Sequence, residues 1–159
     1  MRKIKFRAWN KKKGIMNYDN EDETDDYWDG VCTSKLEMVN MILSIPDKDD
    51  AYSINSFRDH YEVMQYTGLK DKNGTEIYEG DILKCGDFPY EPPQYVVRFG
   101  KFMDSHDMYY RQEYLGWYVN EIGKQDEYKN PLTYIVDMLD GVVCGNIYEH
   151  PHLLRGDSP

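Results

Sequence analysis

The chain has 159 residues and a formal net charge of −10, with 29 acidic and 19 basic side chains. This length fits one globular unit, or two small subdomains that share a core. The acidic balance opposes non-specific binding to nucleic acid, whose affinity comes mainly from neutralising phosphates. No stretch reaches the roughly 18–20 apolar residues of a membrane span, and the N-terminus lacks the apolar region of a signal peptide, so we expect a cytoplasmic protein without a membrane partner.

The first predicted elements are two strands joined by a turn. Residues 3–9 alternate with the two-residue period of a strand, and residues 15–18 return as a second strand after the turn residues 10–14. The strand side with Arg7 and Trp9 leaves two alternatives. Either this cation and this aromatic ring are exposed and contact a partner, or Trp9 packs on a second layer while Arg7 pairs with an acid.

Two oppositely charged blocks and a helix precede the middle of the chain. Residues 2–13 contain seven basic side chains and no acidic one, whereas residues 19–29 contain seven acidic side chains and no basic one. The acidic block is expected to be an exposed loop, and its spacing does not match an EF-hand calcium loop. Ser34 and Glu37 have the spacing of a capping box, which predicts a helix over residues 35–44 before Pro46.

The middle of the chain predicts strands joined by tight turns. Residues 62–67 and 82–85 are rich in strand formers, and Asp71–Gly74 is the strongest turn signal in the chain. Gly68 and Gly80 are expected where the backbone needs a positive φ or a bend. One carboxylate near Gly80 is expected to cap backbone amides. Backbone geometry and sheet packing do not fully account for three polar residues in this region: Gln65, Glu79 and Asp81.

The C-terminal part predicts further strands and one helix. Residues 94–99 form a strand that ends at Gly100, and residues 108–120 form one long strand or a hairpin around Gly116. The aromatic residues of 109–118 either fill the core or form an exposed stripe that would indicate an interface. Asn130 and Pro131 are expected to begin a helix that continues through residues 132–139, and residues 142–148 form the last strand.

Together these elements predict a mainly β protein with two or three short helices. The C-terminal half has about five short strands, enough for a small β-barrel of SH3-like type. We expect an N-terminal region of residues 1–62, with a β-hairpin, an acidic loop and a short helix, and a barrel region of residues 63–159.

Three blocks of the sequence resemble the YopX family of bacteriophage and prophage proteins. They lie near the start, middle and end of the chain: Lys5 to Asn10 with Met16, Met64 to Asp71 with Glu76 to Ile82, and Gly145 to Glu149 with Pro151. Asn10 and His150 stand where similar proteins often have Asp and Asn. The resemblance implies a phage or prophage origin, an SH3-like C-terminal half, and a unit that self-associates. The family has no assigned activity, so no catalytic residue is transferred.

No residue pattern points to an enzyme, a cofactor or a metal. The three cysteines are widely spaced and are expected to be reduced thiols rather than disulfide or zinc partners. Asp104–Asp107 places Asp, Ser and His together, but triads are assembled from distant positions and no nucleophile elbow accompanies these residues. His150 and His152 are too few for a metal site. Neither glycine-rich phosphate motif occurs.

We therefore expect a non-enzymatic phage or prophage accessory protein that acts through protein–protein contact. Its partner is expected to be a second copy of the chain, or an unidentified host or phage protein. The residues singled out for interaction are Arg7, Trp9, Gln65, Glu79 and Asp81. The alternative is a nucleic-acid-related role, either local binding through the basic residues 2–13 or acidic mimicry of DNA directed at a host protein.

Overall fold

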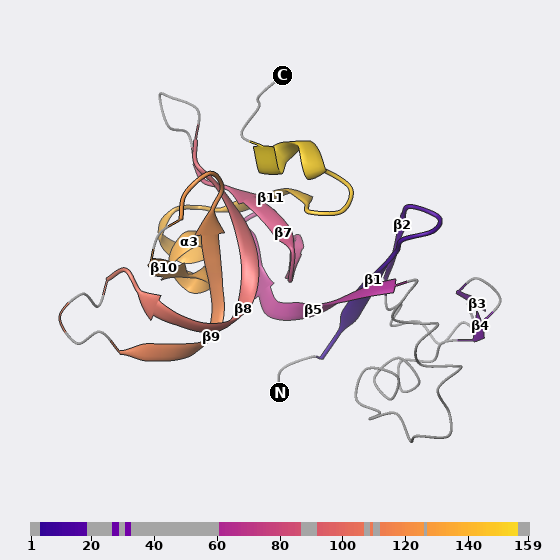
Figure 1. Cartoon of the computed structure of the whole chain (residues 1–159), viewed down its shortest axis with the longest axis horizontal. Coiled ribbons are helices and arrows are strands. Elements are labelled where there is room, and N and C mark those ends of the chain that lie inside the picture. Colours follow the sequence, from indigo (N-terminus) through magenta and orange to yellow (C-terminus); the bar gives the residue numbers. More distant parts are fainter. Residues whose placement is uncertain are drawn as a thin grey trace. The chain divides into compact units, whose positions relative to one another are not determined.

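The computed structural model describes residues 4–18, 27–28, 31–32, 61–86, 92–106, 109, 112–125 and 127–155, and it is mainly β (Figure 1). The chain divides into two compact units, Lys5–Val63 and Met64–Pro159, the second of which also includes Met1–Ile4. In the described part there are one α-helix, α3 (Leu132–Met138), and one 3-10 helix, η1 (Pro151–Arg155). Neither is long and apolar enough to cross a membrane. The helix predicted over residues 35–44 lies outside the described residues.

The N-terminal unit contains the predicted hairpin. Strand β1 (Phe6–Asn10) pairs antiparallel with β2 (Ile15–Tyr18), and β1 lies between β2 and β5 (Tyr61–Lys70) in the strand order. The Asn10 side-chain oxygen accepts hydrogen bonds from the backbone N–H groups of Lys12 and Lys13, at 3.0 and 2.9 Å, and thereby closes the turn. A short ladder also joins β3 (Tyr27–Trp28) to β4 (Val31–Cys32).

The C-terminal unit includes β5 from Met64 onward and continues with β6 (Glu76–Tyr78) and β7 (Asp81–Lys84). Gly68 and Gly80 have φ values of 90° and 78°, as predicted for positions that need the left-handed region. The Asp71–Gly74 turn is also confirmed, but Asn73 does not have the positive φ of a type I′ turn. Instead the N–H of Gly74 donates to the carbonyl of Asp71, at 2.9 Å.

Strand β7 and the four strands that follow it in the sequence form one curled sheet. Its order is β10 (Tyr128–Pro131), β9 (Glu113–Glu121), β8 (Gln94–Asp104), β7 and β11 (Val142–Asn146). β10 pairs antiparallel with β9 through Asn130 and Pro131, and it also pairs in parallel with the end of β8 through Tyr128 and Lys129. Because one short strand contacts both partners, the sheet bends back on itself, and Figure 1 shows the long curved course of β8 and β9.

Several boundaries differ from the predicted ones, and β11 ends at Asn146 rather than at residue 148. β8 continues through Gly100 to Asp104, and β9 passes through Gly116 as a single strand, so a hairpin around Gly116 is wrong. Gly100 and Gly116 instead lie directly opposite each other in the β8–β9 ladder, whose hydrogen bonds hold both glycines in the strands. The helix also begins later than predicted. Asn130 belongs to β10, and Pro131 is the residue before α3.

The core lies between the curled sheet and α3. Its buried members are mostly aliphatic and come from α3 and from strands distant in sequence: Ile77, Leu83, Val97, Val119, Leu132 and Ile135, together with Cys85 and Tyr95. Burying each such aliphatic side chain stabilises the fold by about 1.5–3 kcal/mol. The apolar periodicity that predicted the strands and the helix therefore identifies the residues that hold this unit together.

Candidate functional site

Asp81, one of the three unexplained polar residues, has a structural role. Its carboxylate is 1% exposed and accepts a hydrogen bond from the backbone N–H of Tyr78, at 2.7 Å. The bend beside it is held by the Gly80 N–H, which donates to the carbonyl of Val97 at 3.0 Å. The predicted capping carboxylate near Gly80 is therefore confirmed, and it is the carboxylate of Asp81.

Gln65 and Glu79 face each other across the strands beside this bend. The N–H of Glu79 donates to the carbonyl of Gln65, at 2.9 Å. Both side chains are half-buried. Burial raises the pKa of the Glu79 carboxyl, and the positive charge of Arg98 partly offsets this effect. The interaction role predicted for Gln65 and Glu79 stays a prediction.

The Asp71 carboxylate accepts three backbone hydrogen bonds, although the sequence singled Asp71 out only as a turn residue. One carboxylate oxygen accepts the N–H groups of Asn73 and Thr75, each at 2.9 Å, and the other accepts the N–H of Val143 on β11, at 3.0 Å. Burial raises the pKa of this carboxyl, but the three backbone hydrogen bonds outweigh burial and leave the pKa below its ordinary value. Asp71 thus links the turn to a strand 72 residues away.

The structure contradicts the alternative in which Arg7 is exposed. Its side chain is only 4% exposed, and the neighbouring Ala8 is fully buried, so an exposed Arg7 on a partner surface is wrong. Trp9 is half-buried, and its ring lies over Gly14 across the turn, where a Cβ on the glycine would be 3.9 Å from the ring. The interaction role predicted for Trp9 stays a prediction.

Three of the basic residues in the segment 2–13 proposed for nucleic-acid contact, Lys11, Lys12 and Lys13, lie in the β1–β2 turn. Lys11 forms an ion pair with Glu62, with 2.6 Å between the ammonium nitrogen and the carboxylate oxygen. Lys12 and Lys13 are exposed, and their backbone N–H groups are both bound by Asn10. One of the three consecutive lysines is thus already neutralised within the chain, which reduces the charge available for phosphates.

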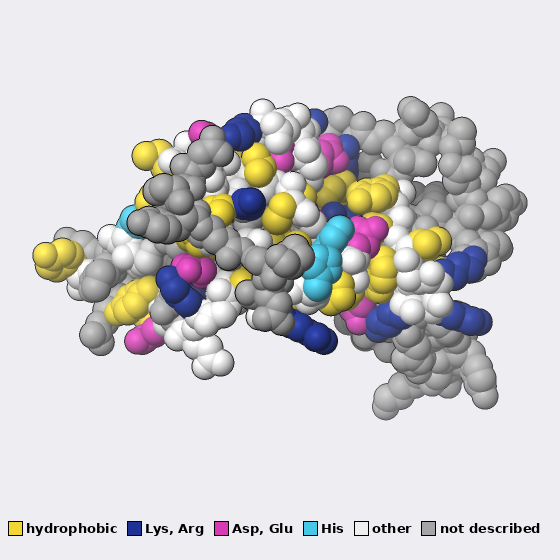
Figure 2. All heavy atoms as spheres, turned by 90° about the horizontal axis from the view of Figure 1, so that it is seen from above, with side chains coloured by type: hydrophobic (Ala, Val, Ile, Leu, Met, Phe, Trp, Pro, Cys, Tyr) yellow, Lys and Arg dark blue, Asp and Glu magenta, His cyan; other side chains and the backbone are white. Residues whose placement is uncertain are grey.

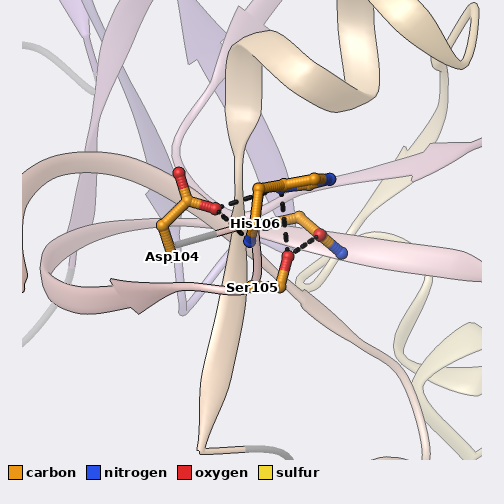
Figure 3. Close-up of polar contacts among 4 residues, drawn as sticks. Asp104, Ser105 and His106 are labelled. Atoms are coloured by element: carbon orange, nitrogen blue, oxygen red, sulfur yellow. Dashed lines mark hydrogen bonds and ion pairs between the residues drawn. The ribbon is translucent and has the colours of Figure 1, made fainter. Parts of the chain in front are cut away.

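The Asp104, Ser105 and His106 side chains do lie together, at the end of β8 (Figure 3). His106 Nδ1 is 3.0 Å from the Asp104 carboxylate and 3.2 Å from the Ser105 hydroxyl. The Ser105 hydroxyl donates to the side-chain oxygen of Asn130, at 2.5 Å, and the imidazole ring packs on Tyr134 with 4.1 Å between the ring centres.

This geometry is not that of a hydrolase triad. In a triad, the carboxylate and the nucleophile contact different nitrogens of the imidazole, whereas here both contact Nδ1. The hydroxyl proton also points to Asn130 rather than to a base. The Ser105 N–H donates to the carbonyl of Lys129, at 2.9 Å, so the cluster fastens the end of β8 to β10 and α3. The polar loop predicted here is a structural anchor.

The thiols and histidines of the described residues show no metal or nucleophile arrangement. Cys85 is buried, and burial together with the charge of Glu121 raises its pKa to about 11. Burial also raises the pKa of Cys144, and both thiols are free, which favours protonated, unreactive sulfur. His150 Nδ1 lies 3.4 Å from the N–H of Asn146, and no group of three potential metal ligands occurs in the described part.

Two exposed large apolar side chains lie on the β8–β9 ribbon. Phe99 is 51% exposed and Leu115 is 70% exposed. Phe99 pairs with Trp117, and Lys101 pairs with Leu115. Because directly paired residues, and residues two apart on one strand, share a face of the sheet, these side chains lie on the same face. We call this face the ribbon surface and define it by four residues: Phe99, Lys101, Glu113 and Leu115.

The opposite face of the ribbon is also aromatic. The rings of Phe102 and Tyr118 stack with 5.3 Å between their centres, across the gap left by the Gly100–Gly116 pair. A Cβ on Gly100 would be 3.7 Å from the Tyr118 ring. The rings of Phe102 and Tyr114 are 6.0 Å apart. Aromatic packing over a cross-strand glycine pair stiffens the ribbon that presents Phe99 and Leu115.

The ribbon surface also contains both signs of charge. Lys101 Nζ is 2.8 Å from a carboxylate oxygen of Glu113, and these side chains are 69% and 57% exposed. At the left end of Figure 2, where β8 and β9 lie in Figure 1, hydrophobic side chains appear beside basic and acidic ones. Phe99 and Leu115 were not predicted as a pair, because the predicted strand ended at Gly100, whereas β8 continues to Asp104.

Comparisons with known proteins give a family and similar solved structures. The crystal structure of protein EF1440 from Enterococcus faecalis is similar over 97% of this chain and 99% of that chain, with a TM-score of 0.50 and 22% sequence identity. At this identity the likeness concerns the fold alone. A search of curated proteins gave no match. The family model for the YopX protein matches residues 5–155, nearly the whole sequence, and therefore the chain belongs to the YopX family.

Proposed function

We propose that this chain is a non-enzymatic accessory protein of phage or prophage origin that acts in the cytoplasm through protein–protein contact. The observation that supports the proposal is the exposure of Phe99 and Leu115 on one face of the β8–β9 ribbon. Single exposed apolar residues are normal on protein surfaces, but neighbouring large ones on a rigid element favour an interface. The partner is a second copy of the chain, or a host or phage protein.

The fold supports the same proposal. We propose that the curled sheet is a small barrel of SH3-like type, closed where β10 pairs with both β9 and β8. The Ser105–Asn130 hydrogen bond and the His106–Tyr134 contact fasten the end of the ribbon to β10 and α3. A surface on a strand that is held at both ends loses little conformational entropy on binding, which favours affinity.

The test compares substitutions at two apolar residues whose exposed fractions are nearly equal. Leu115 on the ribbon is 70% exposed, and Met138 on α3 is 71% exposed. The tagged wild-type chain, Leu115→Ser and Met138→Ser are each used for affinity capture in lysate of the native bacterium supplemented with untagged chain. We expect the wild type and Met138→Ser to retain a stoichiometric partner and Leu115→Ser to lose it. Equal recovery by all three would contradict the proposed surface.

A further inference from the structure

We propose that the ribbon surface binds the same surface of a second copy of this chain, related by a two-fold axis. The inference rests on the proposed function, because it names the partner of the ribbon surface. The partner therefore presents the same groups as this surface: two exposed apolar side chains beside one cation and one anion.

The charge balance of the ribbon surface favours contact between two copies. A chain with a net charge of −10 repels its own copies over most of its surface. The ribbon surface departs from this excess of acid, because it contains one cation, Lys101, and one anion, Glu113, with 2.8 Å between their charged atoms. Two ribbon surfaces therefore meet without the repulsion that acidic surfaces of two copies would experience.

The Lys101–Glu113 pair also makes the ribbon surface self-complementary in charge. An isologous interface uses the same patch on both subunits, so the patch has to be complementary to itself. A two-fold axis passing between Lys101 and Glu113 brings Lys101 opposite Glu113 of the partner subunit, and the reverse pair forms by symmetry. The four charges then alternate in sign around the axis, so every neighbouring pair attracts.

The apolar side chains of the ribbon surface lie directly beside these charges. Leu115 is directly opposite Lys101 in the ladder, and Phe99 is two residues before Lys101 on the same face. Both side chains are at least half-exposed and would be covered by the second ribbon. Burying them supplies the free energy of association, while the exposed ion pairs add little by themselves and fix the register of the contact.

The experiment uses charge reversal of each partner separately. Lys101→Glu gives two acidic positions on the ribbon surface, and Glu113→Lys gives two basic ones, so neither variant has an ion pair within its own chain. Sedimentation velocity over a concentration series gives the dimer dissociation constant of each protein. We expect a dimer for the wild type and a dissociation constant weakened roughly tenfold or more for each variant alone.

The decisive sample is an equimolar mixture of the two variants. In a mixed dimer, Glu at 101 faces Lys at 113 of the other chain, and Lys at 101 faces Glu at 113, so both cross-subunit pairs are restored. We expect the mixture to recover wild-type dimerisation within about threefold. Because neither chain regains its internal ion pair, a purely intramolecular role for Lys101 and Glu113 would give no recovery, and that result would overturn the inference.

A matched control is the Lys124–Glu121 pair, whose charged atoms are 2.7 Å apart. Lys124→Glu and Glu121→Lys change the net charge in the same way, and we expect both to dimerise like the wild type. Equal weakening by these controls would overturn the inference, since it would show a general charge effect. Leu115→Ser is the second variant and is expected to be monomeric with unchanged circular dichroism.

A monomeric wild type at every concentration would also overturn the inference, but it would not by itself overturn the proposed function. The capture experiment distinguishes the two. If the wild type is monomeric while Leu115→Ser loses a foreign partner that Met138→Ser retains, the ribbon surface binds another protein and only the inference fails. If neither substitution changes self-association or capture, both proposals fail.

Discussion

The segment from Met64 to Lys84 and the β8–β9 ribbon use their unusual residues in opposite ways. In the central segment the polar groups are bound inside the fold: Asp81 accepts the N–H of Tyr78, and Asp71 accepts three backbone N–H groups. In the ribbon, Phe99 and Leu115 are exposed. The segment with the most distinctive sequence therefore builds the fold, whereas the more ordinary ribbon provides the surface that is available for binding.

The largest expected effect comes from making the same substitution, leucine to alanine, in both regions. Leu83 on β7 is fully buried, and Leu115 on the ribbon is 70% exposed. We expect Leu83→Ala to lower the free energy of unfolding by about 2–5 kcal/mol, because it removes buried methyl groups and leaves a cavity. Leu115→Ala is expected to change it by no more than about 0.5 kcal/mol. Urea denaturation measures the free energy of unfolding of both variants. Similar losses of stability would contradict the assignment of Leu83 to the core and of Leu115 to the exposed surface.

The second prediction concerns the carboxylate that links the central turn to β11. Asp71→Asn replaces one acceptor oxygen by an NH₂ group, which faces a backbone donor whichever way the amide is turned. We expect a loss of about 1–3 kcal/mol in the free energy of unfolding. Asp137→Asn, on the exposed side of α3, is the control and is expected to be neutral. A neutral Asp71→Asn would show that these hydrogen bonds contribute little.

The third prediction is the pH dependence of that same effect. The pKa of Asp71 is lowered in the folded chain because its backbone hydrogen bonds outweigh burial. The unfolded chain therefore binds a proton at Asp71 more readily, so the carboxylate's contribution is complete above the unfolded pKa and is lost as the pH falls through the folded pKa. We expect the stability difference between wild type and Asp71→Asn to be constant above about pH 5 and to shrink below about pH 4. A pH-independent difference would exclude this mechanism.

The smallest expected effects are changes in stability of opposite sign at two glycines that lie opposite each other in the ribbon. Gly100 has a φ of 154°, which side chains with a Cβ rarely adopt, so Gly100→Ala is expected to cost about 1–2 kcal/mol. Gly116 has open space at the Cβ position and no positive φ, so Gly116→Ala is expected to stabilise the chain by about 0.4–1 kcal/mol through the unfolded state. Thermal denaturation of both variants tests the sign of each change.

Much of the fold was predictable because its signals are local. Alternation of apolar residues predicted β1, β2, β5, β7 and β11, and helical spacing predicted α3. The positive φ of Gly68 and Gly80 followed from the conformational freedom of glycine. The length of β8 was not predictable in this way, because Gly100 looks like a strand end until Gly116 is known to pair with it.

The candidate surface depended on contacts between distant residues. Arg7 and Trp9 had the composition of a binding patch, but burial of Arg7 removed it from the surface. Phe99 and Leu115 gave little separate signal, since each is an ordinary strand residue and only the β8–β9 register places them on one face. Asp104, Ser105 and His106 are the residue types of a catalytic triad. In the structure, however, the Asp104 carboxylate and the Ser105 hydroxyl both contact Nδ1 of His106, which is not triad geometry.

The sequence by itself determined the mainly β character, the central turns and membership of the YopX family, because these depend on local backbone preferences and on residue order. The tertiary structure alone decided which side chains are exposed. Exposure depends on strand register and on what packs against each face, and a single residue of register reverses the face that a side chain occupies. For this reason the side chains of Asp71 and Asp81 are buried, while those of Phe99 and Leu115 are exposed.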